Sequence, residues 1–127
     1  MSVTHKTHSP GFLALVQDAK TRVAEIDTAG YQKLRDQAHV LIDVREDHEW
    51  SEGHAADAMH LSKGTIERDI ENTVPDKSSV LVLYCGGGYR SALVADNLQK
   101  MGYRNAISLD GGWSAWNQAG FKVVKDS

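Results

Sequence analysis

The sequence predicts an α/β fold, in which a central, mostly parallel sheet carries helices on both faces. Two nearly continuous apolar runs, at 40–44 and 80–84, are typical of parallel strands that are buried on both faces. A shorter run follows at 106–109, and segments with helical spacing separate the runs. Because these strands alternate with helices, the connections between them are expected to be parallel crossovers.

The N-terminal part of this fold is expected to begin with a helix over 10–22. Ser9 is placed to cap the helix and Pro10 to open it. A strand at 23–26 should follow, and Asp27 or Thr28 should cap a second helix. One apolar stripe of the first helix is expected to face the core: Phe12, Leu15, Val16, Ala19 and Val23.

The other helices are expected at 47–52, 65–72, 91–101 and 113–119, and a minor strand at 59–61. Gly102 and Gly120 are placed to end the last two of these helices.

Length and composition indicate one globular domain of 127 residues, which we expect to comprise a flexible tail at 1–9 and a folded part at 10–127. The net charge of −3 gives no basic surface for nucleic acid. No segment approaches the ~20 apolar residues that span a bilayer, and the polar residues 1–8 include no apolar run of the kind expected in a signal peptide. We therefore expect a cytoplasmic protein that binds neither membrane nor nucleic acid. We expect no metal and no cofactor, because His5 and His8 alone do not make a metal site.

The only cysteine, Cys85, lies between the predicted strand 80–84 and a predicted helix, within Tyr-Cys-Gly-Gly-Gly-Tyr-Arg-Ser at 84–91. Backbone N–H groups and the helix dipole can stabilise a thiolate at such a position, and glycines let the chain curl around one atom. Ligands of parallel α/β sheets also bind at the carboxyl ends of strands. The alternative is an inert core thiol, but that would need neither the glycines nor Arg90.

Three separated segments together resemble the single-domain rhodaneses, a sulfurtransferase family. They are 41–54, with Asp-Val-Arg, Glu-Trp and Gly-His; 84–91, the cysteine loop; and 109–120, with Gly-Gly, Ala-Trp and Ala-Gly. The resemblance covers about residues 23–124 and implies a rhodanese-like fold. Asp57 stands where the family has glycine, and aspartate tolerates the positive φ expected there. The extra N-terminal helix is expected either to pack on the sheet or to cover an oligomer surface.

The resemblance implies that Cys85 takes a sulfane sulfur from a donor such as thiosulfate, becomes a persulfide, and passes the outer sulfur to an acceptor. Attack requires the thiolate, whose free pKa is ~8.5, so the site must favour ionisation. The acceptor would be cyanide, a small thiol or a cysteine of a partner protein, since no second thiol can resolve the persulfide within the chain. Five residues are predicted to ring the sulfur and bind substrate: Gly86, Gly87, Gly88, Tyr89 and Arg90.

Asp43, Arg45 and Ser91 are predicted to support the site. Asp43 should hold backbone near the loop, and Arg45 should form an exposed pair with Glu49 across a turn. If a histidine assists the cysteine, His54 and His60 are the candidates.

Two other functions remain open. A carrier would hold a persulfide for a partner protein without turnover of small molecules. A phosphatase or arsenate reductase is less favoured, because the loop from Cys85 to Arg90 has six residues and Tyr84 replaces the preceding histidine of those enzymes. Since positions 86–88 carry no basic residue, the loop should attract dianionic thiosulfate weakly.

Overall fold

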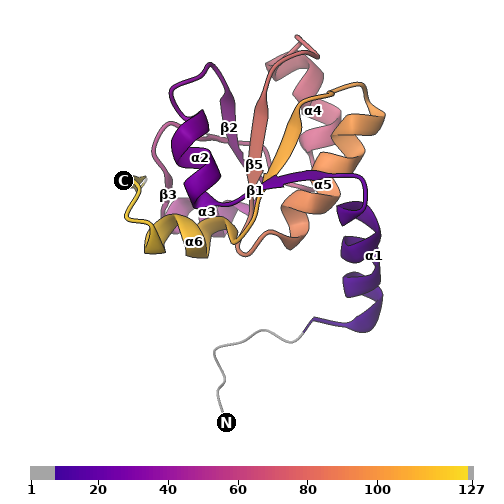
Figure 1. Cartoon of the computed structure of the whole chain (residues 1–127), viewed down its shortest axis with the longest axis horizontal. Helices are drawn as coiled ribbons and strands as arrows, with labels where there is room; N and C mark the ends of the chain where they lie inside the picture. The colour runs from indigo at the N-terminus through magenta and orange to yellow at the C-terminus, as the bar shows by residue number, and fades with distance from the viewer. Residues whose placement is uncertain (1–7, 126–127) are drawn as a thin grey trace.

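A computed structural model describes residues 8–125 and confirms the predicted α/β class (Figure 1). Five parallel strands form the central sheet in the order β1-β6-β5-β2-β4. Their bounds are Ala24–Ile26 for β1, Ala106–Leu109 for β6, Leu81–Tyr84 for β5, Val40–Asp43 for β2 and Met59–His60 for β4. A second, antiparallel pair, β3 (His54–Ala55) and β7 (Val123–Val124), was not predicted. Two-residue strands give too short a pattern to be recognised in a sequence.

Six helices are present in the described part of the chain: α1 (Pro10–Lys20), α2 (Thr28–Leu34), α3 (Asp47–Glu52), α4 (Ile66–Thr73), α5 (Tyr89–Lys100) and α6 (Gly112–Gln118). Helices α4 and α5 pack on one face of the sheet, and α2 and α6 pack on the other. The side chain of Asp27 accepts the N–H of Gly30 at 2.8 Å, so Asp27 rather than Thr28 caps α2. No helix within residues 8–125 has the length and apolar character needed to cross a bilayer.

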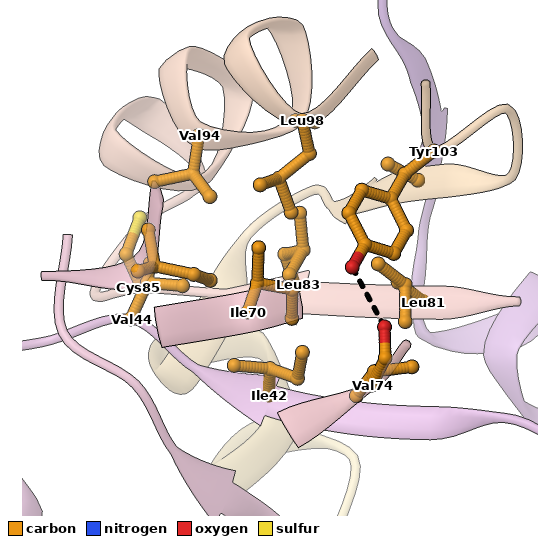
Figure 2. Close-up of a cluster of buried hydrophobic side chains, with 13 residues drawn as sticks. Ile42, Val44, Ile70, Val74, Leu81, Leu83, Cys85, Val94, Leu98 and Tyr103 are labelled. Atoms are coloured by element: carbon orange, nitrogen blue, oxygen red, sulfur yellow. Dashed lines mark hydrogen bonds between the residues drawn. The ribbon is translucent and has the colours of Figure 1, made fainter. Parts of the chain in front are cut away.

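Strand β5 divides its side chains between the two faces of the sheet, as the two-residue period of a strand requires. Leu81 and Leu83 face the core cluster that includes α4 and α5, whereas Val82 and Tyr84 face the other cluster. Cys85, directly after the strand, continues the first set, and Figure 2 shows it beside Val44 and Val94. The alternation therefore directs the thiol toward α5.

Helix α1 packs on α5, below it in the view of Figure 1. Arg22, just after α1, binds the carboxylate of Asp96 through Nε at 3.0 Å and Nη2 at 2.8 Å. Val16 and Ala19 are buried, but Leu15 is 61% exposed, so the prediction that Leu15 faces the core is wrong. The reason is that α1 packs on another helix, α5, which covers a narrower stripe than a sheet would.

Two backbone features decide where the loops turn. Asp57 has a φ of 70°, the left-handed conformation that was expected where the family has glycine. Helix α5 begins at Tyr89 rather than at the predicted residue 91, because Gly88 adopts a φ of 101° and reverses the chain there. Residues 1–7 of the tail expected at 1–9 lie outside the described residues.

Candidate active site

The thiol of Cys85 lies at the carboxyl end of β5 and is only 1% exposed. Its Sγ accepts the main-chain N–H of Gly88 at 3.1 Å and that of Ser91 at 3.4 Å. The predicted donors were the amides of residues 86–90. Of these, the structure gives Gly88 a hydrogen bond to the sulfur, and it adds Ser91, one residue beyond the predicted set. Both donors belong to the first turn of α5 or its cap, where N–H groups have no helical partner.

A chain of hydroxyl groups continues behind the sulfur. The thiol donates to Ser91 Oγ at 3.6 Å, and Ser91 Oγ lies 2.7 Å from Ser108 Oγ in β6. Ser91 and Ser108 are both fully buried. When the sulfur is ionised, the Ser91 hydroxyl can donate to it while accepting a hydrogen bond from Ser108. The arrangement therefore offers a third hydrogen bond to the thiolate.

The start of α6 fixes the cysteine loop from outside. The N–H of Trp113 donates to the carbonyl of Cys85 at 2.7 Å, and that of Ser114 donates to the carbonyl of Gly86 at 3.2 Å. A Cβ at Gly112 would overlap the carbonyl oxygen of Cys85, which explains why glycine stands there. Because α6 binds these loop carbonyls, the loop can turn later N–H groups toward the sulfur.

Arg90 is held beside the thiol by Glu49. Its guanidinium donates from Nη1 and Nη2 to the two carboxylate oxygens of Glu49, at 2.8 and 3.1 Å. These hydrogen bonds lower the pKa of Glu49 to about 2 and raise the pKa of Arg90, to which the nearby Cys85 also contributes. The predicted pair between Glu49 and Arg45 is therefore wrong. Glu49 lies in the first turn of α3, and the fold presents that turn to the cysteine loop.

Arg45 instead forms a buried pair with Asp43 and is only 3% exposed. Its Nη2 donates to Asp43 Oδ2 at 2.8 Å and to the carbonyl of Gly53 at 2.6 Å, while its own N–H donates to Asp43 Oδ1 at 2.9 Å. Burial opposes the charge of Arg45, but the hydrogen bonds to Asp43 raise its pKa. Asp43 thus holds backbone as predicted, at Arg45 rather than at the cysteine loop.

Tyr84 connects this buried pair to the site. Arg45 lies over the ring of Tyr84, at 5.7 Å from its centroid, and Tyr84 directly precedes Cys85. The Tyr84 hydroxyl accepts the N–H of Ala55 at 3.0 Å. Burial, with a smaller contribution from Asp43, raises the pKa of Tyr84, which therefore stays neutral. Asp43 pairs with Tyr84 in the sheet, and the lining of the pocket above the thiol includes none of Asp43, Arg45 and Tyr84.

His54 and His60 do not lie over the thiol. Both stack on Trp50, with ring centroids 3.4 and 4.9 Å away, and His60 Nε2 lies 2.7 Å from the carbonyl oxygen of Arg45. Two other histidines, His8 and His48, line the pocket above the sulfur. The sequence pattern gave no signal for His8, because it lies far from the cysteine loop and before the first helix.

A pocket of about 720 Å³ opens above the thiol. Its walls come from four parts of the chain: the region of α1, the start of α3, the cysteine loop and the start of α6. The residues that line it are His8, Phe12, Glu46, His48, Glu49, Cys85, Gly86, Gly87, Tyr89, Arg90, Trp113 and Ser114. The pocket therefore reaches Cys85 even though its side chain is almost covered.

Three potential metal ligands, Glu46, His48 and Glu49, lie within 4.8 Å of one another at the rim of this pocket. Both carboxylate oxygens of Glu49 bind Arg90, and Oε1 also accepts the N–H of Glu46 at 3.1 Å. A metal ion would have to displace these hydrogen bonds. We therefore describe Glu49 as the ion-pair partner of Arg90, with Glu46 and His48 beside it.

A model of the rhodanese-like domain family matches residues 28–119. A similar structure is a protein of unknown function from Rhodopseudomonas palustris, described as a possible tyrosine phosphatase; it is 26% identical with a TM-score of 0.80, and the match covers 95% of this chain and 99% of that one. The polysulfide-sulfur transferase homodimer of Wolinella succinogenes is 25% identical with a TM-score of 0.76, covering 92% and 89%. A rhodanese-like domain protein of Staphylococcus aureus is 26% identical with a TM-score of 0.67, covering 83% and 100%. The chain belongs to the rhodanese-like domain family.

Proposed function

We propose that this protein is a sulfurtransferase, which moves a sulfane sulfur from a donor such as thiosulfate to a thiophilic acceptor through a persulfide on Cys85. The observation that carries the proposal is the environment of Sγ, which two main-chain N–H groups contact at the floor of an open pocket. Family membership and the likeness to a polysulfide-sulfur transferase support it. A buried thiol with no role in chemistry would need neither a pocket nor donors directed at its sulfur.

The first half of the reaction would form the persulfide. The Cys85 thiolate attacks the sulfane sulfur of thiosulfate, a new S–S bond forms, and the S–S bond of the donor breaks. The electron pair of the broken bond leaves with sulfite, and the enzyme retains Cys85–S–S⁻. The N–H groups of Gly88 and Ser91, at the N-terminus of α5, would stabilise the negative charge before and after the transfer.

The second half would return the enzyme to its starting state. A nucleophile attacks the outer sulfur and the Cys85 thiolate leaves, so cyanide would become thiocyanate and a thiol would become a persulfide. Because the chain has one cysteine, the acceptor has to bring this nucleophile. The reaction needs a reduced thiol, so we place the protein in a reducing compartment such as the cytoplasm.

Phosphate-ester hydrolysis is the weaker alternative, although one similar protein is described as a possible tyrosine phosphatase. In that chemistry a guanidinium would have to bind the oxygens of the transferred phosphoryl group. Both terminal nitrogens of Arg90 already bind Glu49. The ion pair thus disfavours a phosphoryl group at this site.

Steady-state kinetics can test the proposal. We expect the protein to form thiocyanate from thiosulfate and cyanide, and Cys85→Ser to lose this activity, because a hydroxyl is a far weaker nucleophile and leaving group. Equal turnover by Cys85→Ser would contradict the proposal. Persulfide formation without steady-state turnover would instead support the carrier function, and Cys85-dependent hydrolysis of an aryl phosphate would support a phosphatase.

A further inference from the structure

Part of the pocket wall comes from a region that the family model does not match. The match begins at residue 28, whereas His8, just before α1, and Phe12, in its first turn, line the pocket above Cys85. The ion pair between Arg22 and Asp96 joins this helix to α5, which also carries Tyr89. The wall is therefore fixed to the same helix that begins at the cysteine loop.

Three rings form this wall, which we call the aromatic wall: His8, Phe12 and Tyr89. The ring centroid of His8 is 4.6 Å from that of Tyr89 and 5.3 Å from that of Phe12, and the rings of Phe12 and Tyr89 are 6.3 Å apart. None of the three is fully buried, so ring surface remains open to a bound molecule. Such a surface favours an apolar or aromatic group.

The charges of the pocket do not favour a dianion. Among the described residues that line it, Arg90 is the one lysine or arginine, and its guanidinium is paired with Glu49. Glu46 adds a further carboxylate to the lining. Lys20, whose Nζ lies 5.5 Å from the ring centroid of Tyr89, is paired with Glu25 at 3.3 Å, and Lys63 lines an adjoining pocket on the side of Glu46 and His48. A donor with two negative charges would therefore meet little unpaired positive charge next to the sulfur and would be repelled by the thiolate that it must approach.

We infer that the pocket selects organic sulfane donors, which have an apolar or aromatic group near the sulfur and at most one negative charge, over inorganic dianions. Organic persulfides and thiosulfonates are the chemical class, and Phe12 is the specificity-determining residue. This inference rests on the proposed sulfur transfer through Cys85, and it names the donor that the site prefers.

With an aromatic thiosulfonate the step balances as follows. The Cys85 thiolate attacks the terminal sulfur of the donor, and the bond between that sulfur and the sulfonyl sulfur breaks. The electron pair leaves with the aryl sulfinate, and Cys85–S–S⁻ remains. The reactants together carry two negative charges, as do the products, and no oxidant or reductant takes part.

The test compares two donors of equal charge, benzenethiosulfonate and methanethiosulfonate, and the dianion thiosulfate, with cyanide as the acceptor. We expect kcat/KM to be lower for thiosulfate than for benzenethiosulfonate, and an equal or higher value for thiosulfate would overturn the discrimination against dianions. For the unaltered protein we expect kcat/KM to be about ten-fold higher with the phenyl donor, because only this donor can pack on the aromatic wall. In Phe12→Ala the preference should fall to about two-fold. Leu15→Ala is the matched control, since Leu15 lies on the same helix, is 61% exposed and does not line the pocket; its preference should be unchanged.

The ratio of two donors on one variant does not depend on the folded fraction, so a partly unfolded Phe12→Ala sample still gives a usable result. A ratio near one in the unaltered protein, or a ratio that Phe12→Ala leaves intact, would overturn the donor preference while leaving sulfur transfer in place. If no donor adds sulfur to Cys85, as measured by intact mass, the proposed function itself fails.

Discussion

At the scale of residues, the site depends on hydrogen bonds that converge on two groups, the sulfur of Cys85 and the carboxylate of Glu49. The sulfur accepts hydrogen bonds from the N–H groups of Gly88 and Ser91. The carboxylate accepts two hydrogen bonds from Arg90 and holds its guanidinium near the sulfur. The contact between the N–H of Gly88 and the sulfur of Cys85 could be predicted from the sequence, because the two residues lie in the same short loop. It could not predict that Glu49 binds Arg90, since those residues are 41 positions apart and meet only after folding.

The ion pair between Glu49 and Arg90 predicts a pH-dependent contribution to stability. The pKa of Glu49 falls from 4.5 to about 2 on folding, so the pair stabilises the protein at pH values above about 4.5. That contribution is lost as the pH falls from 4.5 toward 2. Because the Glu49 side chain is 23% exposed, we expect Glu49→Gln to lower the free energy of unfolding by about 1–3 kcal/mol at neutral pH.

Denaturant unfolding at several pH values would measure this difference. The gap between the unaltered protein and Glu49→Gln should shrink steadily below pH 4.5. A gap that stays constant across that range would show that the ion pair does not stabilise the fold.

The hydroxyl chain predicts a role for Ser91 in sulfur transfer. Ser91→Ala keeps the main-chain N–H on the sulfur but removes the hydroxyl that lies 3.6 Å from it. We expect kcat/KM for persulfide formation to fall about ten-fold, which is less than the ~10²–10³ lost with a single oxyanion-hole donor, because two main-chain N–H groups still contact the sulfur. Ser51→Ala, an exposed serine on α3, is the control. Full activity in Ser91→Ala would exclude a role for the hydroxyl chain.

At the scale of elements, the carboxyl end of β5 and the starts of α5 and α6 build the cysteine loop, while α1 and α3 complete the pocket. The strands of the central sheet and the helices that cover it could be predicted, because long apolar runs and helical periodicity are local signals. The position of α1 could not be predicted, because the apolar stripe of a helix does not reveal which other element the helix packs against. The outward position of Leu15 and the inward position of Phe12 follow from its packing on α5.

The ion pair between Arg22 and Asp96 predicts how firmly α1 is attached. Asp96→Asn should weaken the hydrogen bonds to Arg22, so backbone amides of α1 should exchange with deuterium several-fold faster while those of β5 do not change. Hydrogen exchange with mass spectrometry would show this. Arg68→Ala, which removes an exposed pair with Asp69, is the control. Unchanged exchange in α1 of Asp96→Asn would mean that apolar contacts alone hold the helix.

At the scale of the whole molecule, the parallel sheet presents its carboxyl edge to a pocket whose walls come from widely separated parts of the chain. The fold class followed from alternating strands and helices, and the location of the site followed from the edge at which such sheets bind ligands. The antiparallel pair of β3 and β7 and the contribution of His8 and Phe12 required the three-dimensional structure. What the sequence could not supply was contact between distant segments that carry no periodic pattern.

The most direct test of the central claim is the intact mass of the protein after incubation with a sulfane donor and removal of the excess. We predict a gain of one sulfur atom, located on Cys85 by peptide mapping, that cyanide removes and that Cys85→Ser does not acquire. An unchanged mass after treatment with thiosulfate and with benzenethiosulfonate, or the same gain in Cys85→Ser, would contradict sulfur transfer at this site.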